Sequence, residues 1–552
     1  MELTFLFLLC CFSLKIAAST RHGSVVLVKN GVNGDYGLKY YDRYVAGAAA
    51  VGNFTDDINK TGWSFLDIST DAGADDMTQA YSAGVLESHL TRIRIAQHWN
   101  NTMRDYCKKP YTGYCTRLQS FLINNTNWIQ QQIKQNQNDS FWHQIALIYS
   151  QINGIIDGFM NKTGKPRTTI DDPLGLFLFY IGGDTEDLEP ALKKPNLKRI
   201  LGSGSCSALI KLLPGNSDLL VAQDTWNGYE SMLRIIKRYH FSYRLNSDPK
   251  SGSVASKMIS FSSYPGAVFS GDDFYITDAG LVTQETTNGN NNDKLWSKIT
   301  PNSVLENFRS MAANRLGNSG KTWVSTFSRY NSGTYNNQWM IVDYKLFTPQ
   351  EQTLKPGLLY VAEQIPGKIT SGDLTKVLKQ QTYWASYNIP YFTDIFKESG
   401  YPRMAWKYGE WFTHEGSPRA KIFKRDHVKV TDLTSMTTLM RYNDFKNDPL
   451  SKCKCNPPYS AENAISARSD LNPANGTYPF GALGHRKHGG TDMKLTSYSL
   501  SKKMRFLSVC GPTSDTQPPF QWSKSDYKAV PHEGHPDLFK FPPVLHDWAT
   551  AP

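Results

Sequence analysis

Cys206 is the residue of this sequence whose surroundings best suit covalent chemistry. It follows a flexible Gly/Ser run at residues 202–205 and opens the apolar segment that ends at Leu213. A thiol there can attack the carbonyl carbon of Ser205, take over its acyl group and pass that group to water. The cut leaves Cys206 with a free α-amine, whose reference pKa of about 7.7–8.0 suits a base that activates its own thiol. We therefore predict self-cleavage before Cys206 and an N-terminal cysteine nucleophile.

The competing interpretation of Cys206 is an ordinary buried or disulfide-bonded cysteine. The chain has eight cysteines. Cys10 and Cys11 belong to a predicted signal segment, which leaves six, enough for three disulfides in a secreted protein. Cysteines two positions apart pair poorly with each other, so the pairing near the C-terminus stays open, and Cys206 is the natural odd one out. The predicted disulfide cysteines are Cys107 and Cys115, which flank a turn-rich segment, and Cys453, Cys455 and Cys510.

The first residues and the glycosylation motifs predict a lumenal protein. Residues 1–19 hold an apolar run too short to span a bilayer, followed by small residues, as in a secretory signal peptide. No later window reaches a spanning length, so we expect no integral membrane segment. Together with the Asn-x-Ser/Thr motifs, this predicts a glycoprotein of the lysosome lumen or a secreted one. These motifs are at Asn53, Asn59, Asn100, Asn124, Asn138, Asn161 and Asn475.

Charge and histidine spacing argue against nucleic acid and metal. The net charge is +11, but the basic residues are scattered, which favours a solvated surface and no nucleic-acid partner. The pairs His485/His488 and His532/His535 have a spacing of three. Neither pair has the neighbouring cysteines or carboxylates of a zinc site, so we predict no metal and no cofactor.

Hydrophobic periodicity predicts a layered α+β protein without a linker between domains. Residues 79–160 have helical spacing, with a third helix over 141–160. Residues 206–213 and 218–222 flank a Pro-Gly-Asn-Ser turn and predict a β-hairpin. If Leu213 pairs with Asp218, Cys206 lies opposite Thr225. Further predictions are a helix over 228–239, strands within 256–261, 267–276, 338–346 and 358–363, and a surface loop over 286–294.

Several long motifs resemble the phospholipase B-like family. The first is Ser-Cys-Ser-Ala-Leu-Ile-Lys-Leu-Leu-Pro-Gly at 205–215, and the last, at 462–475, most resembles the lysosomal branch. Further matches lie at 225–226, 232–237, 331–343, 363–367 and 383–390. The resemblance implies an N-terminal nucleophile hydrolase: a four-layer αββα sandwich made by autocleavage between Ser205 and Cys206. It also implies that a glycosylated, helix-rich fragment 20–205 stays bound to fragment 206–552 as one globular unit.

Two positions depart from the family pattern. Gln223 and Asp224 stand where the family usually has His-Asn, and in the predicted register they border the thiol. If the family's histidine transfers a proton, Gln223 cannot replace it; if it positions the substrate, Gln223 can still hydrogen-bond and Asp224 can hold the new ammonium. We favour the second interpretation, because the α-amine already supplies a base. The Cys453–Cys455 spacing is one residue shorter than the family's cysteine loop, and a bridge to Cys510 is an alternative.

Three further polar residues are candidates for the site. Asn336 and Asn337 precede an apolar strand, where an amide can donate to an oxyanion or simply form a turn. Arg468 either contacts a charged head group or only pairs with Asp470. The predicted function is a lysosomal or secreted hydrolase of amide or ester bonds in lipid-like acyl substrates. The alternative is a processed but catalytically silent lumenal glycoprotein that binds lipid or a partner. The oligomeric state is not predicted.

Overall fold

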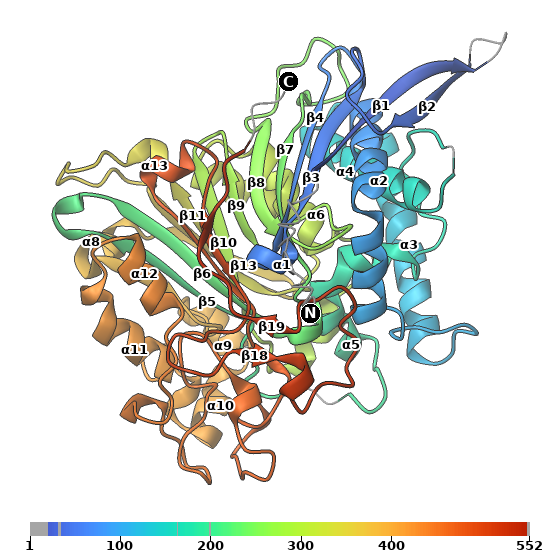
Figure 1. Ribbon diagram of the computed structural model, residues 1–552. Helices are drawn as coiled ribbons and strands as arrows, with labels where there is room; N and C mark the ends of the chain where they lie inside the picture. The colour runs from blue at the N-terminus through green and yellow to red at the C-terminus, as the bar shows by residue number, and fades with distance from the viewer. Residues whose placement is uncertain (1–19, 31–34, 163, 198–199, 549–552) are drawn as a thin grey trace, which may run out of the picture.

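The structure is a computed structural model in which residues 20–30, 35–162, 164–197 and 200–548 are described (Figure 1). The predicted signal segment, with Cys10 and Cys11, lies outside the described residues. The chain is continuous through Ser205 and Cys206, so the structure is that of the uncut polypeptide. No helix of the described residues is long and apolar enough to cross a membrane.

The larger of two main sheets has eleven strands. Its strands pair antiparallel except β4 with β7, which run parallel with Trp63 beside Arg234 and Ser69 beside His240. Strands from before and after residue 206 therefore share one sheet. In spatial order the strands are β13 (Lys368–Asp373), β12 (Leu359–Ile365), β11 (Asn337–Asp343), β10 (Leu281–Thr287), β9 (Phe274–Thr277), β8 (Met258–Ser263), β7 (Arg234–His240), β4 (Trp63–Thr70), β3 (Ala50–Asp56), β1 (Thr20–Asn30) and β2 (Asp35–Tyr41).

The smaller sheet has seven strands and carries the predicted hairpin. Its order is β14 (Tyr383–Ser386), β5 (Cys206–Leu212), β6 (Leu219–Gly228), β16 (Asp492–Thr496), β17 (Leu507–Cys510) and β20 (Val544–Leu545), with β15 (His488–Gly490) paired to the end of β6. A separate two-stranded ribbon joins β18 (Phe520–Gln521) and β19 (Leu538–Phe539).

Three hydrophobic clusters show that the sheets are stacked between helical layers. The alternation of side chains on β5 separates Ala208 and Ile210, which face the large sheet, from Leu209, which faces outward. Ala208 and Ile210 pack in one cluster with Val282 and Met340 of the large sheet. The result is the four-layer αββα architecture that the family resemblance implies (Figure 1).

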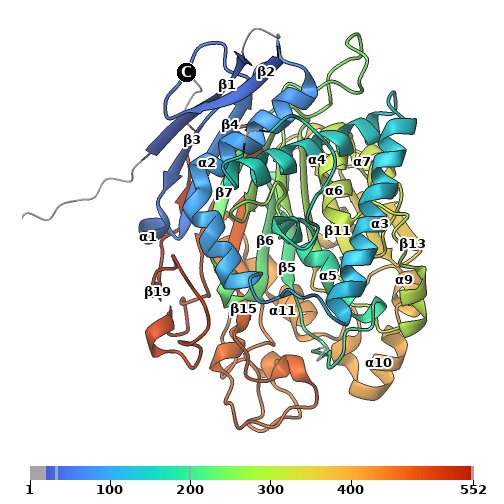
Figure 2. The ribbon, with the colours of Figure 1, turned by 90° about the vertical axis from the view of Figure 1, so that its right-hand side faces the viewer.

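Each outer face of the sandwich is covered by its own helices. Figure 2 shows α2, α3 and α4 together on one side of the molecule, where they cover the large sheet with α6 and α7. Helices α10, α11 and α12 cover the smaller sheet. The bounds are α2 (Asp76–Thr102), α3 (Tyr114–Gln135), α4 (Ser140–Phe159), α5 (Gly182–Ala191), α6 (Glu306–Leu316), α7 (Gly320–Phe327), α10 (Tyr401–Tyr408), α11 (Pro418–Asp426) and α12 (Leu433–Met440). Shorter helices are α1 (Ile58–Thr61), α8 (Thr375–Gln381), α9 (Thr393–Glu398) and α13 (Tyr498–Ser501).

Local predictions from the sequence met different outcomes. The helices within 79–160 and the hairpin are confirmed, and Cys206 lies opposite Thr225 as the predicted register requires. The helix over 228–239 is wrong: residues 229–231 form a short 3-10 turn, and Ile235, Ile236 and Tyr239 lie in the buried strand β7 between β4 and β8. A short apolar run buried on both faces does not separate helix from strand by periodicity. The surface loop over 286–294 is wrong in part, since Asn288 and Asn290 are buried.

Some of the cysteine predictions are confirmed and others are wrong. Cys107 and Cys115 form a disulfide, as predicted. Cys453 and Cys455 bridge each other, which contradicts our expectation that they pair poorly. Cys510 is therefore free and is buried between the two sheets, so the prediction that it is disulfide-bonded is wrong.

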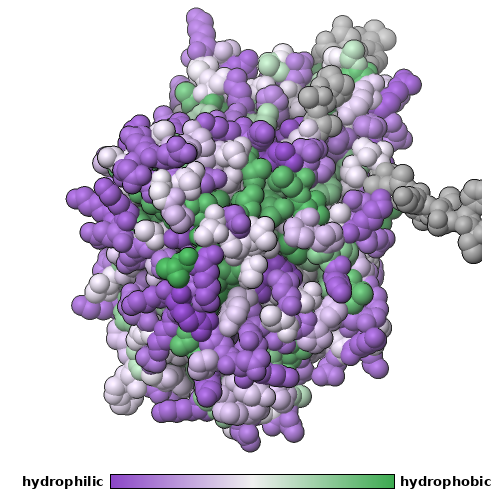
Figure 3. Space-filling view, turned by 60° about the vertical axis from the view of Figure 1, so that its left-hand side comes forward, coloured by the Kyte–Doolittle hydropathy of each residue, from purple (hydrophilic) through white to green (hydrophobic). Residues whose placement is uncertain are grey.

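The surface suits the predicted glycosylation. The face drawn in Figure 3 is mainly hydrophilic, with apolar side chains gathered near its centre. Asn53 and Asn100 are half-buried, and the other five motif asparagines are exposed. Those five are Asn59, Asn124, Asn138, Asn161 and Asn475.

Candidate active site

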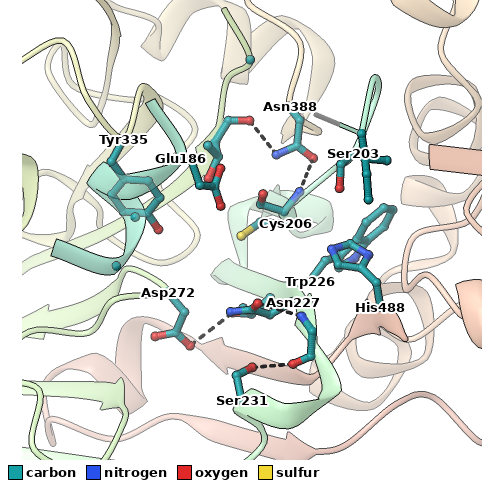
Figure 4. A pocket seen from close by; sticks show the side chains of 18 of the residues that line it. Glu186, Ser203, Cys206, Trp226, Asn227, Ser231, Asp272, Tyr335, Asn388 and His488 are labelled. Carbon is teal, nitrogen blue, oxygen red and sulfur yellow. Dashed lines mark hydrogen bonds between the residues drawn. The ribbon is translucent and has the colours of Figure 1, made fainter. Parts of the chain in front are cut away.

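Cys206 opens β5 at the edge of a large cavity. The cavity has a volume of about 1020 Å³ and is lined from both sheets and from the loops around them. The side chain of Cys206 is only 2% exposed, and Figure 4 shows its sulfur pointing toward the side of the cavity where Tyr335 and Asp272 lie. Ligand pockets commonly enclose about 300–1,000 Å³. The predicted nucleophile therefore lies in a pocket large enough for a substrate.

The peptide bond before Cys206 is held on both sides. The backbone N–H of Trp226 donates to the carbonyl oxygen of Ser205. The N–H of Ser205 donates to Oδ1 of Asn388 over 3.3 Å. A hydrogen bond to the Ser205 oxygen polarises the carbonyl and would stabilise negative charge on that oxygen. This backbone donor was not predicted from the sequence.

Gly204 is crowded in a way that excludes larger residues. A Cβ atom at this position would lie 2.8 Å from Arg419 Nη2, 2.9 Å from Asn388 Oδ1 and 3.0 Å from the ring of Trp226. The Gly/Ser run before the cysteine therefore allows the backbone to approach these groups closely, in addition to supplying flexibility.

The thiol of Cys206 faces a carboxyl group. Its Sγ donates to Oε1 of Glu285 over 3.7 Å, and the hydroxyl of Tyr335 donates to the same oxygen over 3.4 Å. Burial raises the pKa of Cys206 well above its usual value, and the charge of Glu285 raises it further. Burial and the neighbouring Asp273 also raise the pKa of Glu285 well above its usual value. In the uncut chain the thiol therefore keeps its proton.

Arg419 joins Cys206 to the outer helices of the smaller sheet. It lies on α11, and its Nη1 donates to the carbonyl oxygen of Cys206 over 2.6 Å and to Oγ of Ser207 over 3.3 Å. Its guanidinium also stacks 4.2 Å from the ring centre of Trp226. Burial lowers the pKa of Arg419 to about 10, which still leaves it charged near neutral pH. The position of Cys206 is thus fixed by a cation as well as by β6.

A buried network of charges supports the strand opposite Cys206. Lys494 on β16 contacts Asp492 over 2.7 Å and Asp272 over 3.2 Å, and it also donates to Oγ1 of Thr225. Arg234 pairs with both aspartates. Breaking one member of such a network leaves a buried charge unpaired, which is strongly destabilising. The network therefore fixes Thr225 opposite Cys206, and Asp272 also lines the cavity.

The structure separates Gln223 from Asp224. Gln223 is on the same face of β6 as Thr225, and its Nε2 donates to the backbone oxygens of Glu285 over 2.6 Å and Asp273 over 3.3 Å. Asp224 points to the opposite face and packs near Gly490 and Ser466. The expectation that both residues border the thiol is therefore corrected. Asp224 points away because side chains alternate along a strand, and Gln223, which is not among the described residues that line the cavity, bonds the backbone of Glu285 instead of the thiol.

The amide donors of the two asparagines are used elsewhere. Nδ2 of Asn336 donates to Asp187 over 3.0 Å and to the Gly333 oxygen over 2.9 Å. Nδ2 of Asn337 donates to Glu306 over 3.3 Å. Neither residue is among the described side chains that line the cavity. The oxyanion role predicted for them has no support in this geometry.

Arg468 is paired and buried. It makes two hydrogen bonds of 2.9 Å to the carboxylate of Asp470 and donates to the backbone oxygens of Thr513 and Pro518. Of the two predicted roles, the structure agrees with pairing and contradicts contact with a substrate head group in the cavity.

Among the described residues, no group of three or more His, Cys, Asp or Glu side chains is arranged to hold a metal ion.

The fold and site together define a layered αββα protein whose cavity encloses a cysteine at the start of a strand. The family model for phospholipase B matches residues 50–546. The chain is 51% identical to phospholipase B-like 2 of Mus musculus, over 93% of this chain and 87% of that one. It is 51% identical to phospholipase B-like 2 of Homo sapiens, over 91% and 86%. The chain therefore belongs to the phospholipase B family.

More distant proteins show lower similarity. Phospholipase B-like protein B of Dictyostelium discoideum is 36% identical over 92% of this chain and 86% of its own. Among solved structures, a mutant of the conjugated bile acid hydrolase from Clostridium perfringens aligns with a TM-score of 0.30 and 8% identity, over 62% of this chain and 97% of that chain. The architecture given above rests on the sheets and helices of this chain, not on that alignment.

Proposed function

We propose that this chain is the precursor of a hydrolase that cuts amide or ester bonds of lipid-like acyl substrates, with Cys206 as an N-terminal nucleophile. The observation that carries the proposal is the position of the Ser205–Cys206 peptide. Its carbonyl oxygen is bound by the N–H of Trp226, its nucleophile lies in the cavity, and Gly204 before it is tightly enclosed.

Self-cleavage proceeds in two steps, an acyl transfer to sulfur and a hydrolysis. Sγ of Cys206 bonds to the carbonyl carbon of Ser205, the C–N bond breaks, and the thiol proton ends on the released amine. Water then attacks the resulting thioester, which frees the Ser205 carboxylate and regenerates the thiol. The N–H of Trp226 stabilises the oxyanion in both steps.

Substrate turnover repeats this chemistry with an external acyl group. The free α-amine of Cys206 accepts the thiol proton and returns it to the leaving amine or alcohol. Arg419 holds the carbonyl oxygen of Cys206 and so limits movement of the new chain end. A nucleophile and a base on one residue need no separate histidine, which fits the glutamine at position 223.

We further propose that the two fragments stay associated and that the protein acts in the lysosome lumen or after secretion. The exposed glycosylation motifs support passage through the secretory pathway. The parallel pairing of β4 with β7 supports association, because a cut at residue 205 would leave that ladder intact.

The test is a comparison of processing and turnover in three forms of the full chain. Wild-type protein is expected to give two fragments with Cys206 at the new N-terminus, and the processed form is expected to hydrolyse acyl amides or phospholipids. Cys206→Ala is expected to remain one chain, and Cys206→Ser is expected to cleave slowly because a hydroxyl performs the same acyl shift. Two fragments from Cys206→Ala would rule out self-cleavage.

A second function is that of a processed but silent protein that binds lipid or a partner in the cavity. It applies if turnover needs a proton-transferring histidine at position 223, because Gln223 cannot transfer a proton. Binding of an acyl amide without hydrolysis, at acid and neutral pH, would favour this alternative.

A further inference from the structure

The segment before the predicted cut forms part of the cavity wall and is held there by contacts along its length. Residues 200–203 and Ser205 are among the lining residues. At its far end the segment contacts apolar groups, since a Cβ on Gly202 would lie 2.9 Å from the ring of Phe480 and 3.1 Å from that of Trp411. Leu201 packs against the same outer cluster, and its carbonyl oxygen accepts from the N–H of Ala482 over 3.2 Å.

At its near end the segment contacts polar groups. Oγ of Ser203 accepts from Nη1 of Arg486 over 3.0 Å. The N–H of Ser205, on the carbon next to the scissile carbonyl, donates to Oδ1 of Asn388 over 3.3 Å. The segment is thus polar beside the nucleophile and apolar further away.

Asn388 is fixed as an acceptor. Its Nδ2 donates to the Thr287 oxygen over 2.7 Å, which leaves Oδ1 directed at Ser205. Its own carbonyl oxygen accepts from the hydroxyl of Tyr401 over 2.8 Å, and its backbone φ is +67°, in the left-handed region. Non-glycine residues in that region are uncommon and gather at functional sites.

The acyl group of the chain and the acyl group of a substrate pass through the same chemical species. In self-cleavage, the Ser205 carbonyl becomes a thioester on Sγ of Cys206. In turnover, a substrate carbonyl becomes a thioester on the same atom. The contacts that hold residues 201–205 therefore describe the acyl group that the site accepts.

We propose that the acyl site selects N-acylated aminoacyl groups: acyl groups with an N–H on the carbon next to the scissile carbonyl and an apolar chain further out. The inference rests on the proposed function and sharpens its substrate class. In the reaction, Sγ bonds to the aminoacyl carbon, the amide C–N bond breaks, and the proton goes to the leaving amine. Water then releases the N-acylamino acid and restores the thiol. Asn388 binds the N–H throughout.

The test uses processed protein and two amides that differ in one hydrogen-bond donor. One is octanoyl-glycyl-seryl p-nitroanilide, and the other carries a methyl group on the serine nitrogen. Loss of the donor leaves a buried acceptor unpaired, so we expect kcat/KM to fall about tenfold. Asn388→Gly, which keeps the left-handed backbone but removes the acceptor, is expected to bring the ratio of the two amides near one. Asn388→Asp keeps an acceptor and is expected to keep the preference.

The control is Asn216→Gly, at an asparagine with φ of +54° in the turn at the other end of the β5–β6 hairpin, and it is expected to keep the wild-type ratio. Equal turnover of both amides by wild type would overturn the proposal and leave the hydrolase intact.

If neither amide is cut, the proposed function fails for these substrates, and self-cleavage then decides the inference. Processing of the Asn388→Gly precursor about tenfold slower than wild type would support the acyl site, whereas an unchanged rate would overturn it.

Discussion

The two free cysteines of the described chain have much in common. Cys206 and Cys510 both lie on the smaller sheet, and each is 2% exposed. Burial raises the pKa of both thiols, that of Cys510 to about 12. By burial and acidity alone, neither thiol would be recognised as a nucleophile.

Their surroundings differ. Cys206 begins its strand, lines the cavity and follows a peptide bond whose carbonyl is already hydrogen-bonded. Cys510 ends β17 in the inter-sheet core, where a Cβ on Gly62 would lie 3.0 Å from its sulfur and 2.9 Å from Phe541. A hydrogen-bonded carbonyl next to it, rather than a low pKa in the uncut chain, distinguishes the thiol that we propose to be reactive from the thiol in the core.

The largest expected effect is the difference in processing between removal of the Cys206 sulfur and removal of the Cys510 sulfur. Cys206→Ala should abolish the two fragments, and Cys510→Ala should give them at the wild-type rate, because Cys206 directly follows the Ser205 carbonyl whereas Cys510 is packed in the inter-sheet core. Denaturing gel electrophoresis of purified protein over time measures both rates. Loss of processing in Cys510→Ala, with the protein still folded, would show that the core thiol also takes part in self-cleavage.

The second effect concerns the close packing before Cys206. Gly204→Ala would push the scissile peptide away from Arg419, Asn388 and Trp226, and displacements of about 1 Å can cost about 100-fold in rate. We expect processing to slow by about that factor, as measured by the appearance of the C-terminal fragment. Gly252→Ala is the control, since its Cβ would meet only a Leu245 methyl at 3.7 Å. Equal processing rates for both variants would show that the close packing at Gly204 does not position the scissile peptide.

The third effect is a shift in the pH dependence of processing. The carboxylate of Glu285 raises the pKa of the Cys206 thiol, so Glu285→Gln should lower that pKa and move the rise of the processing rate to lower pH. The measurement is the processing rate of each precursor across a pH series. Glu363→Gln is the control: burial raises the pKa of Glu363 to about 7, and its carboxyl bonds Gln338 and the N–H groups of Tyr391 and Phe392 instead of the thiol. A shift toward higher pH in Glu285→Gln would contradict the assigned cause.

The smallest effect is on stability. Cys510→Ala removes a buried sulfur from the inter-sheet core, and we expect the free energy of unfolding to fall by about 1–2 kcal/mol. Cys510→Ser should cost more, because it also buries a hydroxyl group. Urea unfolding of the uncut proteins, followed by tryptophan fluorescence and compared in a Cys206→Ala background, measures both. A serine variant more stable than the alanine variant would show that the site admits water or a partner.

The parts of the site that the sequence predicted are local, and the rest come from distant segments. The hairpin register follows from a turn signal and two apolar runs within seventeen residues, so Cys206 and Thr225 could be placed together. Glu285 lies 79 positions from Cys206, and Arg419 lies 213 positions away. No pattern in one sequence pairs them with the thiol, and the Trp226 donor is a backbone group that every residue but proline possesses.

The errors have physical causes as well. The segment 228–239 has consecutive apolar residues because β7 is buried on both faces, and that pattern also fits a helix. Asn336, Asn337 and Arg468 are polar and near apolar strands, as site residues often are. Their hydrogen bonds are instead satisfied by buried partners in the two sheets and loops.

The ladder between β4 and β7 has a consequence for how the protein is made. Seven residue pairs from Trp63 to Ser69 and from Arg234 to His240 join segments on either side of residue 205. A cut there would turn an intramolecular contact into an association between two molecules, so unfolding would become dependent on concentration. Refolding would then require the separated pieces to meet again. The uncut chain would be the only form able to assemble at high dilution. Cleavage would then make unfolding irreversible in dilute solution, because the separated fragments would not find each other again.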